Sequence, residues 1–115
     1  MKGKLHLSIE PRGESKAILK LEGSVDPETV RQLETAFKQL DKDGVRHIVV
    51  DLSHMTYISS SGLALLVNAK VDRVQKRGDV ILVGPQPAVR NVLDILLKNV
   101  FRIAPSVDEA LNRQD

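Results

Sequence analysis

Two short apolar segments lie on either side of one long helical pattern, and this arrangement constrains the fold more than any other feature. The segments are Ile48–Leu52 and Asp79–Val83, and the helix is expected from about Gly62 to Lys76, with Gly78 ending it. Apolar strands without alternation are typical of central strands that are covered on both faces. Strand, helix and strand at this spacing predict a right-handed crossover between two parallel strands.

Further segments extend this unit into a larger sheet. Leu5–Ile9 alternates apolar with polar residues, as half-buried strands do, and Pro11 and Gly13 interrupt the pattern. A second strand is expected at Ala17–Leu21, so these two strands should form an antiparallel hairpin at one edge. A short edge strand is also expected at Val100–Ile103.

Three further helices are expected to pack on the sheet. Asp26 and Pro27 suit the N-cap and first position of a helix that Gly44 ends, and Ser106–Glu109 is a capping box for a short last helix. The first of these helices has an apolar face of Val30, Leu33, Phe37 and Leu40. Another helix follows Pro87, and its apolar residues are Val89, Val92, Leu93, Leu96 and Leu97.

The elements together predict one α/β domain over residues 1–115. It contains a mixed sheet, with an antiparallel edge hairpin and mostly parallel strands, and about four helices packed on it. The length suits a single core, and 42% hydrophobic and 28% charged residues are ordinary for a globular chain.

The composition disfavours several classes of function. The chain has no cysteine, so disulfides, thiol chemistry and cysteine-bound metals are excluded. With one Tyr, two Phe and no Trp, it lacks the aromatic platforms that stack nucleic acid bases. The net charge is only +2 and the charges are interspersed, so no nucleic acid partner is expected. Neither a signal peptide nor a membrane span is recognisable, which makes the cytoplasm the expected location.

Catalytic and cofactor motifs are also missing. No glycine-rich dinucleotide or phosphate loop is present, and no cofactor or metal is expected. The serines before Gly62 do not form the glycine-x-serine-x-glycine turn of hydrolases, because Ile58 occupies the first glycine position. His6, His47 and His54 are scattered and lack the acid partners of a triad. The protein is therefore not expected to be an enzyme, and a serine hydrolase is a remote alternative.

The long helix carries basic residues along one side. Lys70, Arg73 and Arg77 share that side, and we expect it to be a solvated outer face. The packed face of the helix is expected to consist of Leu66, Val67, Val71 and Val74.

Three consecutive serines, Ser59–Ser61, stand where the central strand passes into this helix. Serines at such a place cap the helix, and a phosphate attached to one would lie in a favourable field. The residues around the serines are more apolar than a solvated helix end requires: Met55, Tyr57, Ile58, Leu63 and Leu65. Some of them are expected to form an exposed patch that docks a partner.

The segment Asp51–Leu63, DLSHMTYISSSGL, resembles the signature of the STAS domain, most closely that of stand-alone bacterial anti-sigma-factor antagonists. Three other segments are similar to the family in the same order. Leu21–Asp26 resembles its turn before the first helix, Val45–Leu52 its central strand, and Pro87–Leu93 the start of its third helix.

This resemblance implies a binding switch. In this family, the unphosphorylated antagonist binds an anti-sigma factor that is also a serine kinase, phosphorylation releases it, and a phosphatase reverses the change. By position the phosphoacceptor is Ser60, with Ser59 and Ser61 as alternatives, and Asp26 falls where the family has an acid. The residues expected to contact the partner are Asp26, Met55, Tyr57, Ile58, Ser59, Ser61, Gly62, Leu63 and Leu65. We expect the free protein to be a monomer that neither inserts into membranes nor binds nucleic acid.

The chain departs from the family at two places. Ser59 replaces the acid before the phosphoacceptor, and Ser61 is expected to be the structural cap of the helix. Leu96–Val100 lacks a small Ser/Thr-Gly step, which predicts a longer third helix. An alternative function is a STAS subunit of a lipid-transport or stressosome-like assembly, in which the serines belong to a docking module without kinase control.

Overall fold

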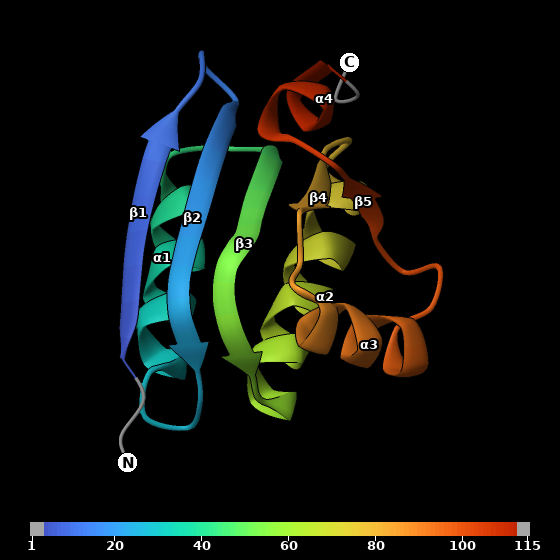
Figure 1. Ribbon diagram of the computed structural model, residues 1–115. Coiled ribbons are helices and arrows are strands. Elements are labelled where there is room, and N and C mark those ends of the chain that lie inside the picture. Colours follow the sequence, from blue (N-terminus) through green and yellow to red (C-terminus); the bar gives the residue numbers. More distant parts are fainter. Residues whose placement is uncertain (1–3, 113–115) are drawn as a thin grey trace.

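The computed structural model describes residues 4–112 and contains a five-stranded sheet with the strand order β1-β2-β3-β4-β5 (Figure 1). β1 and β2 are antiparallel, and each later strand is parallel to its neighbour, so the predicted mixed sheet is confirmed. The elements in these residues are β1 (Leu5–Pro11), β2 (Lys16–Val25), α1 (Val30–Lys42), β3 (His47–Ile58), α2 (Ser60–Gln75), β4 (Asp79–Val83), α3 (Pro87–Leu96), β5 (Arg102–Ala104) and α4 (Val107–Asn112).

Helices cover both faces of the sheet. The larger core lies against α1 and α2, where Leu19 of β2 and Val50 of β3 are completely buried. A smaller core lies on the opposite face, where α4 covers Val49 and Ile81 (Figure 1). β3 and β4 are therefore buried on both sides, which explains their unbroken apolar sequences.

β3 is longer than its apolar core. β4 pairs only with His47–Asp51, so the second half of β3 has β2 on one side and α3 on the other. A bulge separates the halves, and the Asp51 carboxylate accepts hydrogen bonds from the backbone N–H and the hydroxyl of Ser53, at 3.0 and 2.7 Å. The predicted end of this strand at Leu52 is wrong, because a long β2 provides a hydrogen-bonding partner as far as Ile58.

α1 begins three residues later than predicted. Its N-cap is Thr29, whose hydroxyl donates to the carbonyl oxygen of Ser24 at 2.8 Å. Asp26 acts before the helix, because its carboxylate accepts the backbone N–H groups of Glu28 and Thr29 at 2.8 and 2.9 Å. The expected capping side chain thus stabilises a preceding turn, and Pro27 belongs to that turn.

α3 also differs from the prediction. It ends at Leu96, and Asn99 in the following turn has a left-handed backbone with φ of 65°, so the longer third helix is not observed. Leu96 is 63% exposed, although its spacing placed it on the packed face. The serine half of the capping box at the start of α4 is confirmed, because the Ser106 hydroxyl accepts the N–H of Glu109 at 3.2 Å.

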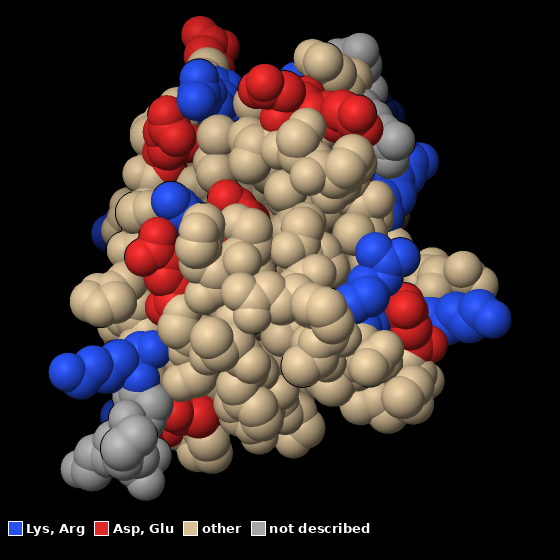
Figure 2. All heavy atoms as spheres, viewed as in Figure 1, with Lys and Arg blue, Asp and Glu red and all other residues tan. Residues whose placement is uncertain are grey.

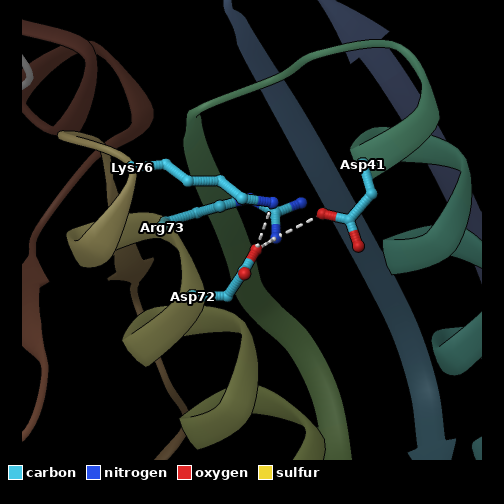
Figure 3. A network of polar contacts seen from close by, with 4 residues as sticks. All are labelled: Asp41, Asp72, Arg73 and Lys76. Carbon is cyan, nitrogen blue, oxygen red and sulfur yellow. Dashed lines mark hydrogen bonds and ion pairs between the residues drawn. The ribbon is translucent and has the colours of Figure 1, made fainter.

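The orientation of α2 near its carboxyl-terminal end contradicts the sequence prediction. Arg73 is only 2% exposed, whereas Val71 and Val74 are 50% and 53% exposed. The Arg73 guanidinium lies between the two helices, with Nη1 2.7 Å from Asp41 of α1 and 2.8 Å from Asp72 of α2 (Figure 3). A buried cation is tolerated when carboxylates pair with it. The prediction is wrong because Asp41 belongs to α1, and the sequence pattern of α2 does not show that α1 lies beside it.

Candidate functional site

The three serines lie at the end of the sheet where β2 and β3 finish and α2 begins. Val25, the last residue of β2, pairs with Ile58, and its carbonyl oxygen accepts the N–H of Ser59 at 2.8 Å. Gly62 allows the first turn of α2 to approach this end. A Cβ on Gly62 would come within 2.7 Å of Val25 Cγ1 and 2.8 Å of Ile58 Cγ1, so this position has no room for a side chain.

Ser59 is the N-cap of α2. Its backbone is extended, and its Oγ accepts the N–H of Gly62 at 3.2 Å and lies 2.9 Å from the Oγ of Ser61. Its residue exposure is 7%, so the hydroxyl is committed to the cap. The expectation that Ser61 is the cap is therefore wrong. Serine and aspartate are both good N-caps, so Ser59 performs a structural task that an acid at this position could also perform.

Ser60 and Ser61 are exposed on different sides of α2. Within residues 4–112 the Ser60 hydroxyl has no hydrogen-bond partner. Ser60 borders an open groove of about 320 Å³ between α2 and α3, whose other lining residues are Leu63, Ala64, Val67, Asn68, Leu96 and Leu97. Ser61 borders a different groove, of about 290 Å³, between α1 and α2, with Val30, Arg31, Glu34 and Leu65. Neighbouring serines thus face separate surfaces.

Most of the apolar residues expected at the surface are buried. Met55 is completely buried, and Ile58 and Leu63 are each 6% exposed, so the expectation that their side chains face a partner is wrong. The continuation of β3 past the bulge directs Met55 and Ile58 into the larger core. Tyr57 is 54% exposed and Leu65 is partly exposed, so these two remain available.

α3 supplies exposed apolar surface that the sequence analysis missed. Ile95 is 79% exposed and Leu96 is 63% exposed, and Leu96 lines the groove beside Ser60. The run Ile95–Leu97 is the signal in the sequence, because three consecutive apolar residues cannot all point to one side of a helix. Ala64 and Asn68, one and two turns after Ser60 on α2, complete the exposed side of this groove.

The groove beside Ser60 has no charged lining residue, but the start of α2 favours negative charge at Ser60. None of the residues that line its groove is charged. Figure 2 shows a broad area without charged side chains where β3 ends and toward α3, with charged residues at its margins. Ser60 is the first residue of α2, where unpaired N–H groups and the helix dipole favour negative charge.

Asp26 lies directly after Val25, next to this junction. Its carboxylate is occupied by the turn before α1, as described above, so it positions the end of β2.

One group of polar side chains on β3 contains the residue types of a catalytic triad. The Ser53 Oγ donates to Asp51 and lies 3.1 Å from the Nδ1 of His54. In a triad the acid holds the base and the base contacts the serine, whereas here both contact the serine. These contacts therefore stabilise the β-bulge and do not form a triad. Across the described part of the chain, no group of three His, Asp or Glu residues could hold a metal ion.

His47, whose pKa is shifted, lies at the other end of β3. Burial lowers the pKa of His47 below its ordinary value of 6.5, and Lys16 and Arg46 lower it further, while Asp79 opposes them. The His47 Nδ1 is buried without a hydrogen-bond partner. This histidine begins β3 and Ser59 follows its last residue, so it takes no part in the serine site.

Comparison with known proteins identifies the family. The model of the STAS domain family matches residues 8–110. The chain belongs to the STAS family. The predicted membership and fold are thereby confirmed. None of the helices in residues 4–112 is long and apolar enough to cross a bilayer.

Relatives of this STAS chain include anti-sigma factor antagonists. It is 35% identical over 92 residues to BtrV of Bordetella bronchiseptica, which is provisionally named as an anti-sigma factor antagonist. The matched residues cover 78% of each chain. It is 28% identical over 101 residues to the anti-sigma-B factor antagonist of Staphylococcus aureus, covering 86% of this chain and 94% of the relative. The fold is similar to that of unphosphorylated SpoIIAA, with a TM-score of 0.81, 23% identity and coverage of 94% and 95%. Phosphorylated SpoIIAA of Bacillus matches with a TM-score of 0.75, 21% identity and coverage of 94% and 98%.

Proposed function

We propose that this protein is an anti-sigma-factor antagonist that binds an anti-sigma factor with serine kinase activity and is released when Ser60 is phosphorylated. The observation that carries the proposal is the exposed, unpartnered Ser60 hydroxyl at the first turn of α2, beside an uncharged groove. The names of BtrV and of the staphylococcal relative support the antagonist role. SpoIIAA, which shares the fold, exists in phosphorylated and unphosphorylated forms.

The geometry favours Ser60 over its two neighbours as the phosphoacceptor. Ser59 is buried, and its hydroxyl caps α2. Ser61 is exposed, but its hydroxyl is bonded to Ser59 and it borders the groove toward α1. Only Ser60 combines an exposed side chain, an unbonded hydroxyl and a position beside the apolar groove between α2 and α3.

A phosphate on Ser60 would be tolerated by the protein and resisted by a docked partner. It adds about −1.5 to −2 charges at neutral pH, and the start of α2 stabilises that charge in the free antagonist. A partner that covers the groove would remove the phosphate from water without an opposite charge in the groove lining. Such desolvation costs several kcal/mol, so we expect affinity to fall by about 30-fold or more.

The proposed docking surface consists of exposed residues around Ser60. Tyr57 remains from the sequence prediction, and Ala64, Asn68 and Leu96 join it from the groove, whereas Leu65 borders the separate groove beside Ser61. Asp26 and Gly62 contribute indirectly, because they shape the turn and the helix start that present Ser60. In this proposal the protein is a binding switch and not an enzyme. The kinase and an opposing serine phosphatase are separate proteins.

The test is a comparison of Ser60→Ala and Ser60→Asp in binding and phosphorylation. The anti-sigma factor kinases encoded by the source organism are purified, and calorimetry measures their affinity for each variant. We expect Ser60→Ala to bind like wild type and Ser60→Asp to bind about 30-fold more weakly. With ATP, mass spectrometry should locate one phosphate on Ser60 in the wild type and none on Ser60→Ala.

Ser106→Asp is the matched control, because it also adds a carboxylate at a helix start and an aspartate can still cap α4. It should bind like wild type. Phosphate on another residue, or wild-type affinity of Ser60→Asp, would refute the switch. If Ser60→Asp binds normally and no kinase modifies the chain, a docking module without kinase control is the better interpretation.

A further inference from the structure

A further cavity adjoins the groove beside Ser60 near the end of α3. It has a volume of about 510 Å³ and lies between α3 and the segment that leads into β5. Leu97 contributes to both spaces, so it forms a wall between them. Clefts that hold small molecules commonly measure about 300–1,000 Å³, so this cavity has sufficient size for a ligand.

The inner part of the cavity is apolar. Leu93 is 3% exposed and belongs to the larger core, and Leu97, Phe101 and Ile103 are partly buried hydrophobic residues packed against that core. Phe101 is one of only three aromatic residues in the chain. The partial exposure of these side chains means that a hydrocarbon body in the cavity would remove apolar surface from water.

The rim of the cavity is charged. The Arg90 Nε lies 3.3 Å from the Asp94 Oδ1, one turn later on α3, so this pair is neutral overall. Lys98 lies in the turn after α3 and has no ion-pair partner among residues 4–112. The cavity therefore joins an apolar floor to a polar rim that carries one unpaired cation.

We propose that this cavity binds a small monocarboxylate with an apolar body, such as a medium-chain fatty acid. The hydrocarbon body lies against Leu93 and Phe101, and the carboxylate faces the ammonium group of Lys98. Asp94 opposes additional negative charge, so a ligand with a single anionic group fits better than a polyanion such as a nucleotide. This site is independent of the proposed switch, because it includes none of the three serines.

Nuclear magnetic resonance titration of the ¹⁵N-labelled protein tests the proposal with octanoate as the probe. A ligand of this size is expected to bind with a dissociation constant in the millimolar range. The largest amide shifts should occur in residues 90–103. Octanol, which lacks the charge, should bind about threefold more weakly, and butyrate, which lacks the apolar body, should cause no saturable shifts.

Lys98→Gln separates this site from general adsorption of a fatty acid. It should weaken octanoate about threefold and leave octanol unchanged, since only the ion pair is removed. Lys38→Gln removes an exposed cation from α1, far outside the cavity lining, and should bind both probes like wild type. Equal octanoate affinity of Lys98→Gln and wild type, or shifts centred elsewhere, would overturn the proposal. Because Lys98 and Lys38 are both exposed, we expect both variants to fold, and unchanged spectra of the free variants verify this.

Discussion

The two ends of α2 differ in whether their polar side chains are exposed or buried. At the amino-terminal end, Ser60 and Ser61 are exposed, and the Ser60 hydroxyl faces solvent beside an apolar groove. Near the carboxyl-terminal end, Arg73 is almost completely buried and paired with carboxylates from two helices (Figure 3). The charged side chain joins helices, and the small neutral ones remain available to a partner. Charge along a helix therefore does not by itself indicate which end of it meets another molecule.

Removal of Arg73 should produce the largest loss of stability. Arg73→Ala leaves a cavity between α1 and α2 and deprives Asp41 and Asp72 of their shared cation. Because both carboxylates are partly exposed, we expect a loss of about 3 kcal/mol, at the lower end for a broken buried pair. Urea denaturation measures the change. Lys76→Ala, which removes an exposed cation that also contacts Asp72, should cost under about 0.5 kcal/mol. Similar losses in both variants would contradict a stabilising role of the buried Arg73 between α1 and α2.

Gly62→Ala should destabilise the opposite end of α2 by a smaller amount. The added methyl group collides with Val25 and Ile58, and their side chains belong to the packed core. Overpacking of this kind costs about 1–3 kcal/mol, from which the better helix propensity of alanine subtracts up to about 1 kcal/mol. Thermal unfolding measures stability. We also expect weaker partner binding because Ser60 is displaced, whereas Arg73→Ala should retain affinity once folded. A stabilised Gly62→Ala protein would show that this helix end has room to adjust.

Ser59→Ala should cost about 1 kcal/mol, because the N-cap hydrogen bond to Gly62 is lost. Ser59→Asp should retain stability, since aspartate caps a helix as well as serine does. Ser61→Ala is the matched control and should have a smaller effect, because Ser61 only contacts the hydroxyl of Ser59. Chemical denaturation of the three variants ranks them. A larger loss in Ser61→Ala than in Ser59→Ala would reverse the assignment of the cap.

His47 should give the smallest effect, which is limited to mildly acidic pH. Burial, Lys16 and Arg46 lower the pKa of His47 below 6.5, so the unfolded chain binds the proton more tightly than the folded one. The stabilising effect of a neutral His47 is complete above pH 6.5 and decreases as the pH falls from there toward the folded pKa. His47→Gln should lose this component of the pH dependence, and Lys16→Gln should narrow its range. Denaturation midpoints across this range provide the measurement. An unchanged profile in His47→Gln would exclude the histidine as its source.

Much of the fold could be predicted because local patterns and tertiary contacts agree. The apolar runs at β3 and β4 match their burial on both faces, and the crossover through α2 follows from their spacing. The prediction failed where a distant segment supplies a partner. β2 extends β3 to Ile58, and Thr29, whose hydroxyl donates to the carbonyl oxygen of Ser24, replaces Asp26 as the residue directly before α1. Such hydrogen bonds join residues whose proximity no local pattern describes.

The candidate site could be predicted only in part. Ser59–Ser61 were recognisable as a group, but their separate positions depend on the first turn of α2, where one hydroxyl is buried and its neighbours diverge. The contribution of Leu96 to the groove was missed because its spacing fitted the packed face of α3. Met55 was expected at the surface because the continuation of β3 was not foreseen.

By itself, the sequence determined the family, the order of strands and helices, and the place where the serines meet a helix start. The family follows from the resemblance of Asp51–Leu63 to the STAS signature. The elements and the place of the serines depend on hydrophobic periodicity, capping chemistry and turn residues, which act over a few neighbouring positions. Only the tertiary structure decided which serine is buried, which apolar residues are exposed and that Arg73 lies inside. The physical reason is that burial depends on what the opposite element supplies. Asp41 provides a charge for Arg73, and Val25 and Ile58 leave space for no side chain at Gly62.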